Sequence, residues 1–252
     1  MHEISLALHN ATFDDVPDLR VRPLADLVEA AARANLHRDN ARYAVAGQGL
    51  GTVLSELQVW AVTGRGDDRR AALAKGCLVA YLMARHTGRT ELAMMIAERG
   101  YEAARRAEHP DLAALMQMNR SGGLMGLGAR WRASVVCTEA LGEVSALPGP
   151  TPDDTRAAEA QGMLLLTAGL VAPRDGRPDD TATYLAEARD LASYIGERNH
   201  MRFHFGPTNV AAWELGLAVG VWHRPRCRRA FRQLTDRFIG VSQQGARGRR
   251  HL

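Results

Sequence analysis

Three histidines near the C-terminal end of the sequence are the first residues whose types could do chemistry. His200, His204 and His223 carry imidazole groups, and Glu197 or Asp236 could add a carboxylate to complete a metal site. His200 and His204 are four residues apart, but the segment between them predicts a loop, so the spacing does not place both rings on one helix face. We therefore interpret them as loop histidines and expect neither a metal nor another cofactor.

The sequence carries none of the common catalytic motifs. It lacks the nucleophile elbow, the phosphate-binding P-loop, the zinc-binding His-Glu-x-x-His pattern and the glycine motif of dinucleotide-binding folds. Two glycine-rich stretches, residues 47–51 and 121–126, are superficially similar to phosphate loops. Both lie in helical patterns, where glycine more often marks a kink or a close helix contact. We expect no catalytic residues.

A set of nine residues suits non-covalent binding of a ligand. An asparagine amide can donate and accept hydrogen bonds, a methionine thioether adapts to irregular apolar shapes, and a tryptophan ring forms a flat apolar wall. The candidate ligand-binding residues are Arg85, Met118, Asn119, Gly122, Met125, His204, Asn209, Trp213 and Glu214. Structural alternatives stand beside them: core filling for the methionines and Trp213, and a local cap at a helix start for Asn209.

Helices must position these residues, because strand patterns are nearly absent from the sequence. Apolar residues recur at spacings of three and four, and acidic or hydroxyl residues such as Asp67, Thr90 and Asp179 open several segments. The predicted helices cover residues 26–36, 41–62, 67–86, 91–107, 112–127, 130–146, 153–171, 179–195 and 208–219, with a further helix at 226–238 as an alternative to an irregular tail. The expected fold class is all-α.

Regularly spaced glycine turns indicate how the helices are organised. Turns are predicted at Gly88, Gly128, Gly176 and Gly220, which are 40, 48 and 44 residues apart. A period of this size with two helices per unit is typical of a helical-hairpin solenoid of the tetratricopeptide-like kind, although those repeats usually have ~34 residues. The first helix of each pair would then line a concave binding surface. The alternative is a single helical bundle whose spacing is accidental.

The charge of the chain is unevenly distributed. The 252 residues include 32 basic and 28 acidic side chains, a net charge of +4. Nine of the arginines and one acid, Asp236, lie in residues 219–252, which leaves 23 basic and 27 acidic residues before them. The basic tail suits an anionic partner, or is a solvated terminus. The body by itself gives no argument for nucleic acid.

The three cysteines and the apolar segments bear on location. Cys77, Cys137 and Cys227 are far apart and odd in number, which indicates neither a disulfide framework nor a zinc site. The sequence has no signal-peptide pattern and no run of about 18 apolar residues, so we expect no membrane association. A reducing cytoplasm is the expected location. We divide the chain into a leader at 1–22, a tetratricopeptide-like ligand- or partner-binding domain at 23–220 and an Arg-rich tail at 221–252.

Two stretches resemble a known family. Pro23-Leu24-Ala25-Asp26-Leu27 with Ala41-Arg42-Tyr43, and later the string from Phe203 to Val210 (FHFGPTNV), are similar to the C-terminal tetratricopeptide-like sensor region of XRE-type helix-turn-helix transcriptional regulators. The resemblance covers roughly residues 20–220. It departs at both ends: the 22 residues before Pro23 are too few for a helix-turn-helix domain, and the segment after Gly220 is Arg-rich. We therefore expect no direct DNA binding.

The resemblance implies a stand-alone sensor or regulatory protein. It would bind a small metabolite or a peptide in a concave groove and act as a homodimer or through a partner protein. A first alternative is an enzyme of secondary metabolism, of cyclase or isomerase type, that recruits Glu214, His204 or Arg85 for acid–base chemistry. A second alternative is a protein–protein adaptor.

Overall fold

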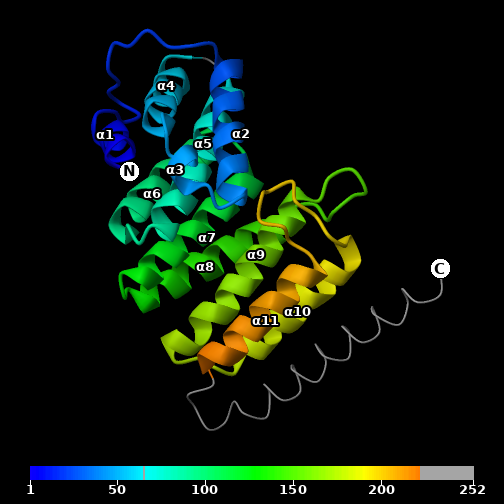
Figure 1. Ribbon diagram of the computed structural model, residues 1–252. Coiled ribbons are helices and arrows are strands. Elements are labelled where there is room, and N and C mark those ends of the chain that lie inside the picture. Colours follow the sequence, from blue (N-terminus) through cyan, green and yellow to red (C-terminus); the bar gives the residue numbers. More distant parts are fainter. Residues whose placement is uncertain (65, 222–252) are drawn as a thin grey trace, which may run out of the picture. The chain divides into compact units, whose positions relative to one another are not determined.

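The computed structural model describes residues 1–64 and 66–221 (Figure 1). These residues are all-helical, and no β-strand occurs among them. The chain divides after Gly149 into two compact units, which we describe separately as unit 1 (Met1–Gly149) and unit 2 (from Pro150). In the described part of the chain, no helix has the length and apolar character needed to cross a bilayer. The predicted tail helix at 226–238 lies outside the described residues.

The predicted helices agree with the observed ones over most of the chain. Unit 1 contains α1 (His2–His9), α2 (Leu24–Asp39), α3 (Tyr43–Ala46), α4 (Leu50–Thr63), α5 (Asp67–His86), α6 (Thr90–Arg106), α7 (Pro110–Gly126) and α8 (Arg130–Ser145). Unit 2 contains α9 (Arg156–Val171), a short 3₁₀ helix η1 (Ala172–Asp175), α10 (Asp180–Ile195) and α11 (Pro207–Val221). The prediction for α5 is correct at both ends, because Asp67 follows a glycine and Thr87 precedes one.

The turns α5–α6 and α7–α8 of unit 1 share one geometry. Gly88 between α5 and α6 has a φ of +71°, and the N–H of Arg89 donates to the carbonyl of Ala84 across 2.9 Å. The turn between α7 and α8 repeats this, with a φ of +83° at Gly128 and a bond from the Ala129 N–H to the Leu124 carbonyl. Such a bond over five residues satisfies a carbonyl that the helix end leaves free.

The turn between α6 and α7 lies in the predicted break between residues 107 and 112, but no glycine marks it. It has the same closure, because the N–H of His109 donates to the carbonyl of Ala104, but the residue with positive φ is Glu108. A glutamate at such a position is uncommon and gives no turn signal in the sequence. The reversals at residues 88, 108 and 128 are therefore twenty residues apart, and α6, α7 and α8 each pack against the preceding helix.

Small and thioether side chains let these helices approach closely. A Cβ added at Gly100 of α6 would lie 2.8 Å from the Sδ of Met116 and 3.0 Å from the Cβ of Cys77. Met83, Met116, Met118 and Met163 are buried, so they fill the interior as the structural alternative predicted. Burial raises the pKa of the Cys77 and Cys137 thiols to about 12, which keeps both protonated and unreactive.

Three sequence-based expectations need correction or revision. The N-terminal segment expected as a leader contains α1, which packs against α4 and buries Ile4 completely. The helix expected at 41–62 is broken, because Gly49 has a φ of +70° and separates α3 from α4. The turn expected at Gly220 was wrong: this glycine lies inside α11. Its neighbours Val219 and Val221 continue the apolar helical pattern, which outweighs one glycine.

A partly buried ion pair fixes the N-terminal segment to α4. The Arg22 guanidinium donates to both carboxylate oxygens of Glu56, and the Arg22 backbone N–H donates to one of them across 2.8 Å. The indole N–H of Trp60 donates to the Arg22 carbonyl. Burial alone raises the pKa of Glu56, but the hydrogen bonds and charge of Arg22 outweigh it and the net pKa is lowered.

We predict that Glu56→Gln lowers the free energy of unfolding by about 1–2 kcal/mol at pH 7, because Arg22 loses a charged acceptor. A lowered carboxyl pKa contributes stability above the unfolded pKa, and this contribution is lost as the pH falls through the folded value. The gap between wild type and variant should therefore shrink from pH 5 to pH 3 in urea titrations. Glu29→Gln is the control, because its ion pair with Arg33 is exposed. A gap that stays constant down to pH 3 would contradict the assignment.

Candidate functional site

The candidate site of unit 2 is built around the loop that joins α10 to α11. Gly196, with a φ of +72°, ends α10, and residues 197–206 form the loop before α11 begins at Pro207. This loop contains the first half of the FHFGPTNV string that carries the family resemblance, and α11 begins with the second half. Its side chains and backbone are bonded to α9, to α11 and to each other, so the string has a clear structural explanation.

The aromatic ring of Phe205 lies directly on the backbone of α9. Phe205 is fully buried, and a Cβ added at Gly162 would lie 2.0 Å from the ring Cζ. Gly206 is required in the same way, because a Cβ there would lie 2.4 Å from Oε2 of Glu197 and 2.8 Å from its Cα. Two positions without side chains thus let the loop lie flat against its neighbours.

Polar groups of the motif close the start of α11. The N–H of Thr208 donates to Oε1 of Glu197 across 2.8 Å, which satisfies one of the free donors of the helix. The amide of Asn209 donates to the carbonyls of Phe203, at 2.7 Å, and His204, at 3.0 Å. Asn209 therefore has a local role, as the alternative predicted, but it holds the preceding loop instead of capping an N–H of the helix.

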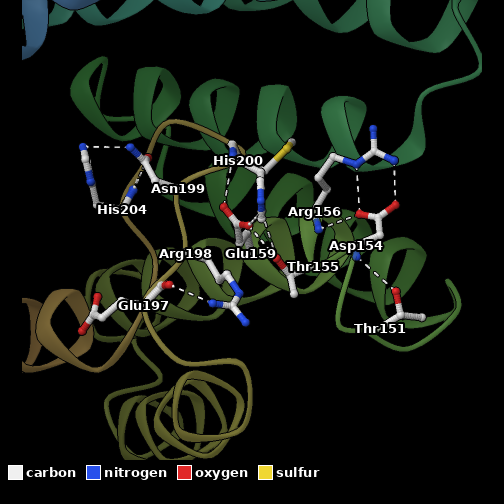
Figure 2. Close-up of polar contacts among 11 residues, drawn as sticks. Thr151, Asp154, Thr155, Arg156, Glu159, Glu197, Arg198, Asn199, His200 and His204 are labelled. Carbon is white, nitrogen blue, oxygen red and sulfur yellow. Dashed lines mark hydrogen bonds and ion pairs between the residues drawn. The ribbon is translucent and has the colours of Figure 1, made fainter.

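A buried carboxylate on α9 holds the other half of the loop (Figure 2). Glu159 is 1% exposed and accepts three hydrogen bonds: from the Thr155 hydroxyl at 2.8 Å, from Nδ1 of His200 at 2.7 Å and from the Met201 N–H at 3.0 Å. These bonds offset the cost of burying the charge. Glu159 was not among the residues predicted from the sequence, although an acid within the small and apolar residues of α9 indicates a bonded group.

Asp154 lies at the entrance to the same helix. The pKa of Asp154 is lowered to about 2, mainly by hydrogen bonds from the side chain and backbone of Arg156, with smaller contributions from the charges of Arg156 and His200. Asp154 and Arg156 are both exposed, so the pair fixes the chain at the start of α9 and adds little stability. His200 is thus a loop histidine with a structural partner, as the sequence predicted.

A groove of about 740 Å³ opens beside this loop in unit 2. Its lining residues come from α9, the loop and α11: Leu170, Glu197, His204, Thr208, Asn209, Ala212, Trp213, Gly216 and Leu217. Apolar side chains form one part of the groove lining, and the polar groups around the start of α11 form the other part. Glu197 is the charged residue of the lining, and the lining includes no lysine or arginine.

The structure brings together three of the four binding residues predicted in unit 2. His204, Asn209 and Trp213 line the groove. Glu214 does not: it is buried, and its carboxylate is paired with Arg189. The pairing removes Glu214 from the acid–base role considered in the enzyme alternative.

The five residues predicted on α5 and α7 belong to unit 1. Met118 and Asn119 are buried, Gly122 and Met125 are half-buried, and only Arg85 is exposed. A Cβ at Gly122 would lie 3.0 Å from the Tyr81 hydroxyl. Met118 and Asn119 therefore do not present side chains on an open surface, because the helical spacing counted from the turn glycines places them on the packed face.

Neither metal-binding side chains nor similarity to known proteins assigns a function to the chain. Among residues 1–64 and 66–221, no group of three or more His, Cys, Asp or Glu side chains could hold a metal, and His223 and Cys227 lie outside this part. No protein-family model matches the chain, and no match was found among curated proteins. The resemblance to XRE-type sensor regions consequently stays a prediction.

We predict that Gly162→Ala destabilises unit 2 by about 1–3 kcal/mol, because a new methyl group would displace the Phe205 ring from its position on α9. Urea unfolding followed by circular dichroism measures the change. Gly169→Ala on the same helix is the matched control, since its nearest neighbours would be at an ordinary 3.8 Å. The control should be neutral or more stable by about 0.5–1 kcal/mol. Equal effects of the two variants would contradict the close contact.

We predict that Asn209→Asp opens the loop locally, because it replaces two N–H donors by a carboxylate facing two carbonyls. Trypsin should then cut after Arg198 or Arg202 at least tenfold faster than in the wild type, under conditions where both proteins stay folded. Asn199→Asp is the control, because its Oδ1 accepts from the His204 N–H and the replacement keeps this acceptor. Slower or unchanged cleavage in Asn209→Asp would show that the loop is held without it.

Proposed function

We propose that the protein is a non-catalytic sensor that binds a small organic molecule, or the end of a peptide, in the groove of unit 2. The groove itself carries the proposal: it has the size of small-molecule sites, about 300–1,000 Å³, and combines an apolar wall with a few converging polar groups. Three of its lining residues, His204, Asn209 and Trp213, are among the ligand-binding residues predicted from the sequence. The resemblance to XRE-type sensors supports the same proposal.

The lining favours a particular chemistry of ligand. Trp213, Leu217 and Leu170 provide apolar surface, and His204 and Thr208 offer polar contacts at the other part. Glu197 adds a carboxylate without a neighbouring cation in the lining. A neutral or cationic ligand with an apolar body therefore fits the groove better than an anion.

The loop at residues 197–206 could change conformation when a ligand binds in the groove. A ligand in the groove contacts His204 and Asn209, whose bonds hold the loop, and α11 follows directly. Binding that selects one arrangement of this loop would shift a population of conformations. We further propose that the hairpins α5–α6 and α7–α8 are tetratricopeptide-like and that a homodimer or a partner protein receives the signal.

The test is native mass spectrometry of the protein purified from its own host, together with thermal shift assays against host metabolite extracts. The wild type should retain a small molecule, and a ligand at 100 times its Kd should stabilise the protein by about 2.7 kcal/mol. We predict that Ala212→Trp, which fills the groove with an indole, abolishes both signals.

The control for this experiment is Ala182→Trp on α10, which introduces the same side chain at an exposed position outside the groove lining. It should bind like the wild type. Retention of the same molecule by Ala212→Trp would place the ligand elsewhere. If the wild type retains no molecule and no extract fraction stabilises it, the sensor proposal fails.

A further inference from the structure

Five exposed arginines without an acidic partner lie at helix ends of unit 1. Arg42, Arg85, Arg89, Arg130 and Arg132 form no ion pair with a carboxylate among the described residues. Arg20 and Arg105 are also exposed without such a partner, whereas Arg22, Arg106 and Arg189 are paired. We call the first five residues the basic rim. It is independent of the groove in unit 2.

Contacts between helix ends make the rim continuous. The rings of Tyr43 and His86 lie 5.3 Å apart, which joins the segment after α2 to the end of α5. Burial, Arg85 and Arg38 together lower the pKa of His86, as expected where cations gather. A Cβ at Gly126 would lie 2.8 Å from Cγ2 of Thr90, so the end of α7 touches the start of α6. The three turns therefore lie side by side (Figure 1).

The balance of charge in these turns is strongly positive. Residues 37–43, 85–91 and 124–132 contain six arginines and two carboxylates, Asp39 and Glu91. Asp39 is paired with Arg38. The basic rim thus keeps its five charges with one unpaired carboxylate nearby, in a body that is acidic as a whole.

Helix stability does not explain most of these arginines. Cations stabilise the C-terminal ends of helices and disfavour the N-terminal ends, where the backbone dipoles are positive. Arg89 is the residue before α6, and Arg130 and Arg132 are in the first turn of α8, which has no acid. Three of the five charges therefore lie where they weaken a helix, so an external partner is a better explanation.

An exposed tryptophan stands within the rim. Trp131 is 69% exposed and lies between Arg130 and Arg132 in the sequence, and Leu127 beside it is 49% exposed. Protein interfaces usually have an apolar centre with charges at the edge. Here a single large exposed aromatic is flanked in the sequence by two arginines, and surfaces that stack bases and bind phosphates combine the same residue types.

We propose that the basic rim of unit 1 binds single-stranded nucleic acid, with the arginines on phosphates and Trp131 against a base. The full chain is tested by fluorescence anisotropy with a labelled 20-nucleotide oligo(dT), a 20-base-pair duplex and poly-L-glutamate at 50–200 mM salt. The single strand should bind more tightly than the duplex, and its affinity should fall as salt rises.

The decisive experiment uses a quadruple variant of the basic rim. It combines Arg42→Gln, Arg89→Gln, Arg130→Gln and Arg132→Gln. We predict at least a tenfold loss of oligo(dT) affinity and a slope of log affinity against log salt that is smaller by about three, at ~0.7 per phosphate contact. Trp131→Ala should lose at least fivefold for the single strand and little for the duplex.

The matched control carries the same change of charge away from the rim: Arg33→Gln, Arg70→Gln, Arg105→Gln and Arg106→Gln. It should bind oligo(dT) within about threefold of the wild type, because charges beyond about 10 Å are screened at these salt concentrations. Circular dichroism checks that all variants stay folded. Undiminished binding by the rim variant would place binding elsewhere, for example in the arginines of residues 222–252, and overturn the proposal. Binding of poly-L-glutamate without oligo(dT) would overturn it in favour of an acidic protein partner.

Discussion

The contact between the Phe205 ring and the Gly162 backbone is the constraint on which the groove of unit 2 depends. A ten-residue loop without regular structure loses considerable conformational entropy when it is ordered, and hydrogen bonds contribute only about 0.5–1.5 kcal/mol each. Burial of Phe205 against α9 provides a non-directional hydrophobic contribution that holds the loop on the helix. The polar bonds of Glu159 and Asn209 then select one arrangement of the loop. The burial of Phe205 and these hydrogen bonds together fix the positions of the groove residues His204 and Asn209.

In unit 1, packing depends on helices of similar length that are joined by similar turns. Its helices from α5 to α8 are reversed every twenty residues by turns with one geometry, and glycines such as Gly100 remove side chains where two helices meet. A repeated length keeps each helix in register with its neighbours, so the same kind of contact recurs along the unit. One consequence is that equivalent helix ends, with whatever charges they carry, lie side by side. The basic rim arises from that repetition.

The sequence could predict the helices because periodic apolar residues and glycine turns are local signals. It predicted a break between residues 107 and 112 but not the positive φ of Glu108, because a glutamate rarely adopts that conformation. It also could not tell that Gly220 stays helical while Gly49 interrupts a helix, since each depends on neighbours distant in sequence. Asn209 and Trp213 were predicted from side-chain type together with an expected place on the first helix of a pair, and His204 from its ability to do acid–base chemistry. Glu159 was missed because its role comes from His200 and Met201, about forty residues away.

The net charge of a long stretch of sequence does not describe the charge at one place on the folded surface. The first 218 residues have more acids than bases, which argued against nucleic acid when the charge was averaged over the chain. Electrostatic interactions at physiological salt extend only about 8–10 Å, so a partner responds to the charges within that distance and not to the average. Arginines at positions 42, 85, 89, 130 and 132 are dispersed in the sequence but lie at helix ends of unit 1 that contact one another. The folded chain therefore concentrates positive charge on a body whose composition is acidic.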